Sequence, residues 1–299
     1  MKRKICIVTS TRADWGLLSG IAQALNKRDD VTLQIIATNM HLAEKYGNTW
    51  QEIERDELKI DYRVEMPTDT ATSADTIKAM SECMTGMSEA FATLKPDLLL
   101  ILGDRFEMLS VASTALIHRI PVAHMHGGEV TQGAFDESIR HSITKMSHIH
   151  FTSTEEARNR VIQLGENPNH VFNTGAIGVY NILNTRFMSR EELEENLNTA
   201  IPKESVFVTF HPSTLDNISP HIQCENLLKA LEERNDIKIF FSYPNNDTGG
   251  ESIISLIEDF VARNPERSVV FPSLGARRYL SVLRCVKAVV GNSSSGILE

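Results

Sequence analysis

Short apolar runs alternate with amphipathic stretches along almost the whole chain. The apolar run at 4–10 precedes a stretch at 14–27 in which apolar residues recur with helical spacing, and Asp14 is placed to cap that helix. A longer helix is predicted from about Ser73 to Leu94. This regular succession of strand, turn and helix predicts an α/β protein with parallel sheets. The other strands predicted in the first half lie at about 31–38, 60–66, 96–102, 120–126 and 148–153.

A charged segment near 175–202 interrupts this pattern, which then restarts. We therefore predict two domains, residues 1–178 and 179–299, the second with strands near 205–212, 237–243, 268–272 and 288–291. Few strands follow the boundary, and the last is followed by about one turn of predicted helix. We expect the second domain to be incomplete and the natural polypeptide to extend past Glu299.

Composition narrows the class of protein. The chain has 299 residues, 41% of them hydrophobic, which is enough for substantial cores. Its net charge of −9 argues against nucleic acid as a partner. The N-terminal apolar run is too short for a signal peptide, and no apolar stretch is long enough to span a membrane. We expect a cytoplasmic protein, because the four cysteines are scattered without a C-x-x-C pair.

Histidines occur two apart at 124 and 126 and again at 148 and 150, which places each pair on one face of a strand. We interpret them as hydrogen-bonded residues at strand ends, because no further ligand at metal-binding spacing accompanies them. No metal is predicted. A nicotinamide cofactor has no support either, since the chain lacks a G-x-G-x-x-G motif.

Polar residues gather where the predicted strands end, which is where parallel sheets bind ligands. The first half offers carboxylates and arginines, suited to acid–base chemistry and to holding an anion. The second half offers neutral groups, among them GNSSSG at 291–296, whose amides and hydroxyls suit a phosphate. The charged residues of the first half are Asp104, Glu129, Asp136, Arg12, Arg105 and Arg140.

Each of these signals also has an ordinary structural interpretation. Asp136 and Arg140 are four apart and could form a surface ion pair, and Arg12 with Asp14 could belong to a helix cap. His211 could simply end a strand, and Ser293 and Ser294 could cap a helix. Taken together, however, all of them fall at one edge of the two predicted sheets, which favours a functional site.

The motifs together resemble those of the hydrolysing UDP-N-acetylglucosamine 2-epimerases of sialic acid biosynthesis, in order from residue 5 to the end. The resemblance implies a GT-B fold, in which two Rossmann-like domains face a central cleft. It also implies conversion of UDP-GlcNAc and water to N-acetylmannosamine and UDP, by anti elimination of UDP and hydration of the resulting glycal, without a cofactor. The motifs that carry the resemblance are TSTRADWG, HLAEKYGNT, GDRFE, HMHGGEVTQGAFDESIRHSITKMSHIHF, NTGAIGVYN, TFHP, YPNNDTGG and GNSSSGILE.

The resemblance also implies roles for individual residues and a homodimer or homotetramer. The polypeptides of this family normally continue past the position of Glu299. The residues predicted to be catalytic are Asp104, Glu129, Asp136, Arg140 and His211. Those predicted to bind substrate are Arg12, His41, Arg105, His141, Asn245, Ser293, Ser294 and Glu299.

Four other functions remain open at this point. The same reaction could act on a UDP-2,4-diacetamido-2,4,6-trideoxyhexose of a legionaminic-type pathway. A non-hydrolysing UDP-GlcNAc 2-epimerase would keep UDP on the product, although the HGGE loop at 126–129 fits the hydrolysing group better. A GT-B glycosyltransferase would need an acceptor, and fold alone does not exclude it. A nucleotide-sugar sensor is less favoured, because binding does not need three carboxylates around the sugar.

Overall fold

The computed structural model describes residues 2–132, 134–212, 218–247 and 249–293. Its first half is a seven-stranded sheet of parallel strands in the order β3-β2-β1-β4-β5-β6-β7. The direction of winding reverses between β1 and β4, which makes that point a natural ligand site. The strands are β1 (Arg3–Thr9), β2 (Val31–Thr38), β3 (Tyr62–Val64), β4 (Leu98–Leu102), β5 (Val122–Met125), β6 (Ile149–Thr152) and β7 (Val171–Asn173).

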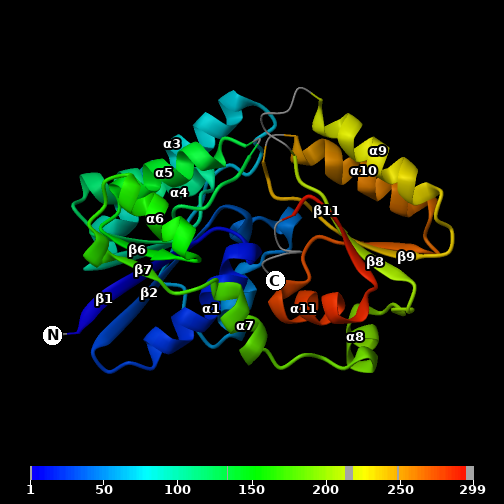
Figure 1. Cartoon of the computed structure of the whole chain (residues 1–299), viewed down its shortest axis with the longest axis horizontal. Coiled ribbons are helices and arrows are strands. Elements are labelled where there is room, and N and C mark those ends of the chain that lie inside the picture. The colour runs from blue at the N-terminus through cyan, green and yellow to red at the C-terminus, as the bar shows by residue number, and fades with distance from the viewer. Residues whose placement is uncertain (1, 133, 213–217, 248, 294–299) are drawn as a thin grey trace.

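Helices cover both faces of this sheet (Figure 1). Successive side chains of β1 point to opposite faces, so Cys6 and Val8 join the core under α3, α4 and α5, whereas Ile7 packs with Trp15 and Leu18 of α1. The helices are α1 (Arg12–Asn26), α2 (Trp50–Arg55), α3 (Ser73–Leu94), α4 (Phe106–Ile117), α5 (Asp136–Met146) and α6 (Glu155–Gln163), with short 3₁₀ turns η1 (Asn39–Leu42), η2 (Glu44–Tyr46) and η3 (Pro168–His170).

The second half repeats this plan with four parallel strands in the order β10-β9-β8-β11. Val206 and Val208 face α9 and α10, while Phe207 between them faces α8 and α11. Its strands are β8 (Ser205–Thr209), β9 (Lys238–Ser242), β10 (Ser268–Phe271) and β11 (Ala288–Gly291). Its helices are α8 (Arg190–Leu197), α9 (Pro220–Glu232), α10 (Gly250–Arg263) and α11 (Gly275–Cys285), and α7 (Ile177–Asn184) connects the halves.

The connecting helix α7 contacts both halves. Ile177 belongs to the core of the first half, and the side-chain amide of Asn181 donates to the carbonyls of Gly16 and Leu17 in α1. Ile182 packs against the core of the second half. A boundary at 178/179 therefore falls inside a helix, and the division into residues 1–178 and 179–299 remains our proposal.

The structure confirms the α/β class and the helix at Ser73–Leu94. The predicted N-cap of the first helix was wrong. Thr11 is the N-cap, and Asp14 is the third helical residue, whose side chain completes a capping box with Thr11. Strand β7, which is three residues long, was not predicted. Among the described residues, none of the helices has the length and apolar character needed to cross a bilayer.

Candidate active site

The loops at the carboxyl ends of the two sheets meet between the two halves. Arg105, which follows β4, donates to the side chain of Asn246, which follows β9, with an Nη2–Oδ1 distance of 2.6 Å. Met40 and Tyr46, after β2, pack against Ile254 of α10. The two halves thus contact each other through segments that follow β2, β4 and β9 and through α10 (Figure 1).

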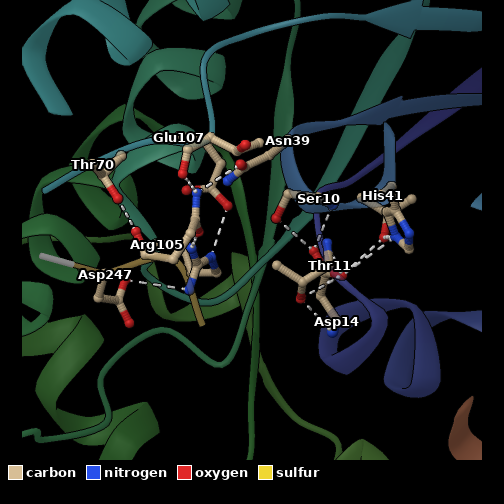
Figure 2. Close-up of polar contacts among 12 residues, drawn as sticks. Ser10, Thr11, Asp14, Asn39, His41, Thr70, Arg105, Glu107 and Asp247 are labelled. Carbon is tan, nitrogen blue, oxygen red and sulfur yellow. Dashed lines mark hydrogen bonds and ion pairs between the residues drawn. The ribbon is translucent and has the colours of Figure 1, made fainter. Parts of the chain in front are cut away.

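The loop after β1 is organised by Asp14. Its carboxylate accepts hydrogen bonds from the hydroxyls of Thr9, Ser10 and Thr11 and from the backbone N–H groups of Ser10 and Thr11. Figure 2 shows this cluster beside His41. Because one carboxylate satisfies so many donors, the loop leading into α1 is held in a single conformation.

His41 supports the same loop. Its ring is fully buried, with Nε2 2.9 Å from the Thr9 hydroxyl and Nδ1 2.8 Å from the Thr49 hydroxyl. Burial lowers the pKa of His41 to about 4, so the ring is neutral at pH 7. We predicted that His41 binds substrate, but in this structure both ring nitrogens are used to position the loop.

Arg140 joins two of the predicted catalytic residues. It lies in α5, is 5% exposed, and donates to the Asp104 carboxylate, to the backbone carbonyl of Glu129 (2.9 Å) and to the Thr131 hydroxyl (2.7 Å). Arg140 therefore pairs with Asp104 and not with Asp136, the residue four positions before it. Burial lowers the pKa of Arg140 to about 10, which still leaves it charged at pH 7.

Glu129 is held as a carboxylate. Its Oε1 accepts from the Ser153 hydroxyl at 2.6 Å and lies 3.1 Å from Nδ1 of His126. Burial alone would raise the pKa of Glu129, but the hydrogen bond and charge of His126, together with Ser153, lower it overall. The backbone at His126 has a φ of +61°, a left-handed conformation that turns the chain sharply from β5 into this loop.

The remaining histidines of the two predicted pairs make hydrogen bonds, as expected. Nε2 of His124 lies 2.8 Å from the Gly103 carbonyl, and Nε2 of His150 lies 3.2 Å from Glu166. Within the described ranges, no group of three or more His, Cys, Asp or Glu side chains is arranged to hold a metal ion.

Asp136 and His141 lie on α5 beside Arg140. Burial raises the pKa of the Asp136 carboxyl, and the negative charge of Asp247 raises it further. His141 is 3.7 Å from Glu137, one helical turn away. The pKa of Glu129 is thus lowered and the pKa of Asp136 is raised, a pattern typical of carboxylates with different roles in one reaction.

Glu107 was not predicted, although it lies within the GDRFE motif. It is fully buried in the first turn of α4, and its Oε1 accepts from Nε of Arg105 at 2.7 Å. Burial alone would raise the pKa of Glu107, but the charge of Arg105 and its hydrogen bond lower it overall. A signal was present, because Glu107 is an acidic residue in a helix that is otherwise apolar on most sides.

In the second half, His211 is held by its neighbours at the strand ends. Its backbone N–H donates to Oδ1 of Asn292 (2.8 Å), and Nδ2 of Asn292 donates back to its carbonyl (2.9 Å). The backbone N–H of Asn245 lies 3.3 Å from Nδ1 of the His211 ring. Burial lowers the pKa of His211, which favours the neutral imidazole.

Two adjoining cavities lie where the halves meet, with volumes of about 30 and 160 Å³. The smaller cavity is lined in part by Arg12, whose guanidinium lies 5.2 Å from the centre of the Tyr279 ring in α11. Ser293 is the second residue after β11, whereas Ser294 and Glu299 lie outside the described residues. The residues shared by both cavities are Thr49, Pro272 and Ser273.

The two sheets meet at the carboxyl ends of their strands, and a comparison with solved structures identifies this fold. The chain superimposes on the crystal structure of Neisseria meningitidis UDP-GlcNAc 2-epimerase bound to UDP-GlcNAc with a TM-score of 0.76, at 16% identity, over 98% of this chain and 78% of that one. The fold is therefore GT-B, as predicted.

Sequence comparison shows the family. The family model for UDP-N-acetylglucosamine 2-epimerase matches residues 23–299. The chain is 42% identical to the hydrolysing GDP/UDP-N,N′-diacetylbacillosamine 2-epimerase of Campylobacter jejuni, over 100% of this chain and 77% of that protein. It is 37% identical to polysialic acid biosynthesis protein P7 of Escherichia coli, over 99% and 75%. The chain belongs to the UDP-N-acetylglucosamine 2-epimerase family.

Proposed function

We propose that this protein is a hydrolysing 2-epimerase that converts UDP-GlcNAc and water to N-acetylmannosamine and UDP. The observation that carries the proposal is that buried Arg140 donates both to the Asp104 carboxylate and to the backbone carbonyl of Glu129, while His211 and Asn245 bond to each other at the strand ends of the second sheet. Proton transfer at the sugar needs carboxylates held in place, which the residues around Arg140 supply. Binding of a nucleotide needs hydrogen-bonding groups, which His211 and Asn245 supply.

The reaction proceeds in two balanced steps. A carboxylate removes the proton from C2 as the bond from C1 to the diphosphate oxygen breaks, and UDP departs with the electron pair. Water then adds its oxygen to C1 of the 2-acetamidoglucal, and a proton reaches C2 on the opposite face. No electrons are gained or lost overall. Arg12 and Arg105 are placed to offset the charge of the departing diphosphate, which is the electrostatic demand of the first step.

The opposite pKa shifts of two carboxylates suggest how the work is divided. Glu129, whose pKa is lowered by His126 and Ser153, suits the role of a base. Asp136, whose pKa is raised by burial and by Asp247, suits the role of a proton donor. Asp104 is linked to Glu129 through Arg140, which donates to the carboxylate of the first and to the backbone carbonyl of the second.

A second substrate has specific support. The relative from C. jejuni is named for a UDP- or GDP-linked diacetamido sugar, N,N′-diacetylbacillosamine. That sugar undergoes the same elimination and hydration at C1 and C2, so the cluster described above serves it equally well. We therefore propose a UDP-2,4-diacetamido-2,4,6-trideoxyhexose as the alternative substrate of the same site.

Proton NMR in D2O tests both candidates. The full-length protein is incubated with each UDP-sugar separately, with Asp104→Asn as the matched control. Free UDP and a 2-epimeric sugar that carries deuterium at C2, both lost in the control, are expected for the true substrate. A UDP-linked epimer would instead indicate the non-hydrolysing reaction, and unchanged sugar that turns over only with an added acceptor would indicate a transferase.

A further inference from the structure

Asn246 is a residue of the second domain that is buried against the first. It follows β9 in the YPNND segment, yet it is only 3% exposed. Its contacts come from the ends of three different strands of the first sheet: Asn39 after β2, Thr70 after β3 and Arg105 after β4. The side chain therefore occupies a socket, defined here as Asn39, Thr70 and Arg105, on the opposite domain.

The chemistry of the partners fixes how this side chain is oriented. Arg105 can only donate, so the atom 2.6 Å from its Nη2 must be the Oδ1 of Asn246. Nδ2 then faces Oδ1 of Asn39 at 2.8 Å, and the Thr70 hydroxyl donates to the backbone carbonyl of Asn246. Both the oxygen and the nitrogen of the Asn246 side-chain amide are thus hydrogen-bonded to residues of the first domain.

Arg105 is held from both domains at once. Its Nε donates to Glu107 in its own domain, whereas its Nη groups contact Asn246 and, at 3.5 Å, Asp247 in the other (Figure 2). Glu107 alone fixes one edge of the guanidinium and leaves rotation about the long side chain possible. The guanidinium also carries more N–H groups than these contacts use, so it can still donate to a bound anion.

We infer that Asn246 is a positioning residue, which aims Arg105 at the departing diphosphate only when the two domains have come together. This inference rests on the proposed function. Arg105 is then correctly placed in the closed enzyme, and UDP leaves only after the second domain has docked. The negative charge of Asp247, the neighbour of Asn246, acts on Asp136 in this arrangement and raises the pKa of the Asp136 carboxyl, after the effect of burial.

Two variants separate positioning from simple packing. Asn246→Ala removes the acceptor, and we expect kcat to fall about tenfold to a hundredfold with KM changed less than about threefold, because a loosely held catalytic group costs rate. Asn246→Asp keeps an oxygen for Arg105, and Asn39 can turn its amide to donate to the new carboxylate. We expect Asn246→Asp to retain kcat within about threefold of the wild type.

Lys45→Gln is the control for the interface itself. Lys45 and Glu251 form a half-exposed ion pair between the same domains that does not include Arg105. We expect this variant to keep wild-type kcat. Equal kcat losses in Asn246→Ala and Asn246→Asp, or wild-type kcat in both, would overturn the positioning role.

Small-angle X-ray scattering gives a readout that does not depend on turnover. With UDP added, the wild type and Asn246→Asp are expected to become more compact, whereas Asn246→Ala stays closer to its UDP-free size. If Asn246→Ala compacts like the wild type, Asn246 does not link the domains and the inference is wrong. A wild type that compacts with UDP but turns over none of the UDP-sugars would overturn the proposed function instead.

Discussion

The two edges that meet in this protein are built from different chemistry. At the first edge, charged groups are buried and neutralise one another: Asp104 pairs with Arg140, and Glu107 with Arg105. At the second edge, Asn245, Asn292 and the ring and backbone of His211 bond to each other through neutral groups. The charges of the first edge are therefore already paired before a ligand arrives, whereas the second edge offers hydrogen bonds at little desolvation cost.

This difference teaches how the work is divided. Buried charges are expensive to assemble, so they are placed where the reaction itself develops charge. A nucleotide leaving group must be bound and then released, which neutral donors and acceptors allow. If the comparison is correct, changes at the first edge reduce kcat and changes at the second edge weaken nucleotide binding.

The largest effect is expected from Arg140→Lys. A lysine keeps the charge but cannot reach the Asp104 carboxylate, the Glu129 carbonyl and the Thr131 hydroxyl together. We expect kcat to fall about a hundredfold to a thousandfold, equivalent to ~3–4 kcal/mol, with the Kd for UDP changed less than about threefold. Steady-state kinetics and calorimetric UDP titration measure the two quantities. A loss of UDP affinity as large as the loss of kcat would break the division between the edges.

Acid should affect the first domain strongly. Burial lowers the pKa of His41 and of His124 to about 4, while their unfolded values are about 6.5. Between these values the unfolded state binds more protons, so stability falls as pH drops from about 6.5 to about 4, by up to ~3 kcal/mol for each histidine. Denaturant titrations followed by tryptophan fluorescence report on this domain, which contains both Trp15 and Trp50.

His124→Gln supplies the matched comparison for that experiment, with the exposed His170→Gln as its control. The first variant should show a shallower loss of stability with acid, since it lacks a group that gains a proton on unfolding. The second should follow the wild type. Identical acid profiles for all three proteins would contradict the linkage.

Asp14→Asn tests how much of the first edge depends on one carboxylate. The amide keeps one oxygen but places an NH2 group against the N–H and hydroxyl donors of Ser10 or Thr11. We expect a loss of about 2 kcal/mol in unfolding free energy, the cost of leaving buried donors unpaired. Urea denaturation measures it, and the exposed Asp29→Asn should remain within about 0.5 kcal/mol of the wild type.

The sequence was informative about which residues reach the site, because the carboxyl ends of parallel strands share one edge. Asp104, Glu129 and Arg140 could be grouped on that basis, and the structure brings them together. Their partners were less predictable. The i, i+4 spacing of Asp136 and Arg140 suggested a local pair, but Arg140 contacts Asp104 from a different strand end, a choice that only the packing of α5 against the sheet determines.

Contacts between the domains were still harder to predict from the sequence. The two asparagines of the YPNND segment look equivalent, yet the backbone of Asn245 contacts His211 in its own domain and the side chain of Asn246 contacts the other domain. Which of them turns outward depends on the backbone that follows β9 and on how the domains dock. Glu107 was more accessible to inference, because a buried acid in an apolar helix requires a partner.

The smallest predicted effect is at the second edge. The side-chain amide of Asn292, the residue after β11, accepts from the His211 N–H and donates to the His211 carbonyl, and so links the segments that follow β8 and β11. Asn292→Ala removes both bonds from an exposed position, so we expect about a tenfold weaker Kd for UDP, equivalent to ~1.4 kcal/mol, with kcat at saturation within about threefold. Calorimetric titration with UDP and saturation kinetics measure the two. Asn292→Asp retains the acceptor for the His211 N–H and should lie between the alanine variant and the wild type. A kcat loss in Asn292→Ala comparable to that of Arg140→Lys would show that His211 acts in the chemistry and that the two edges share the catalytic work.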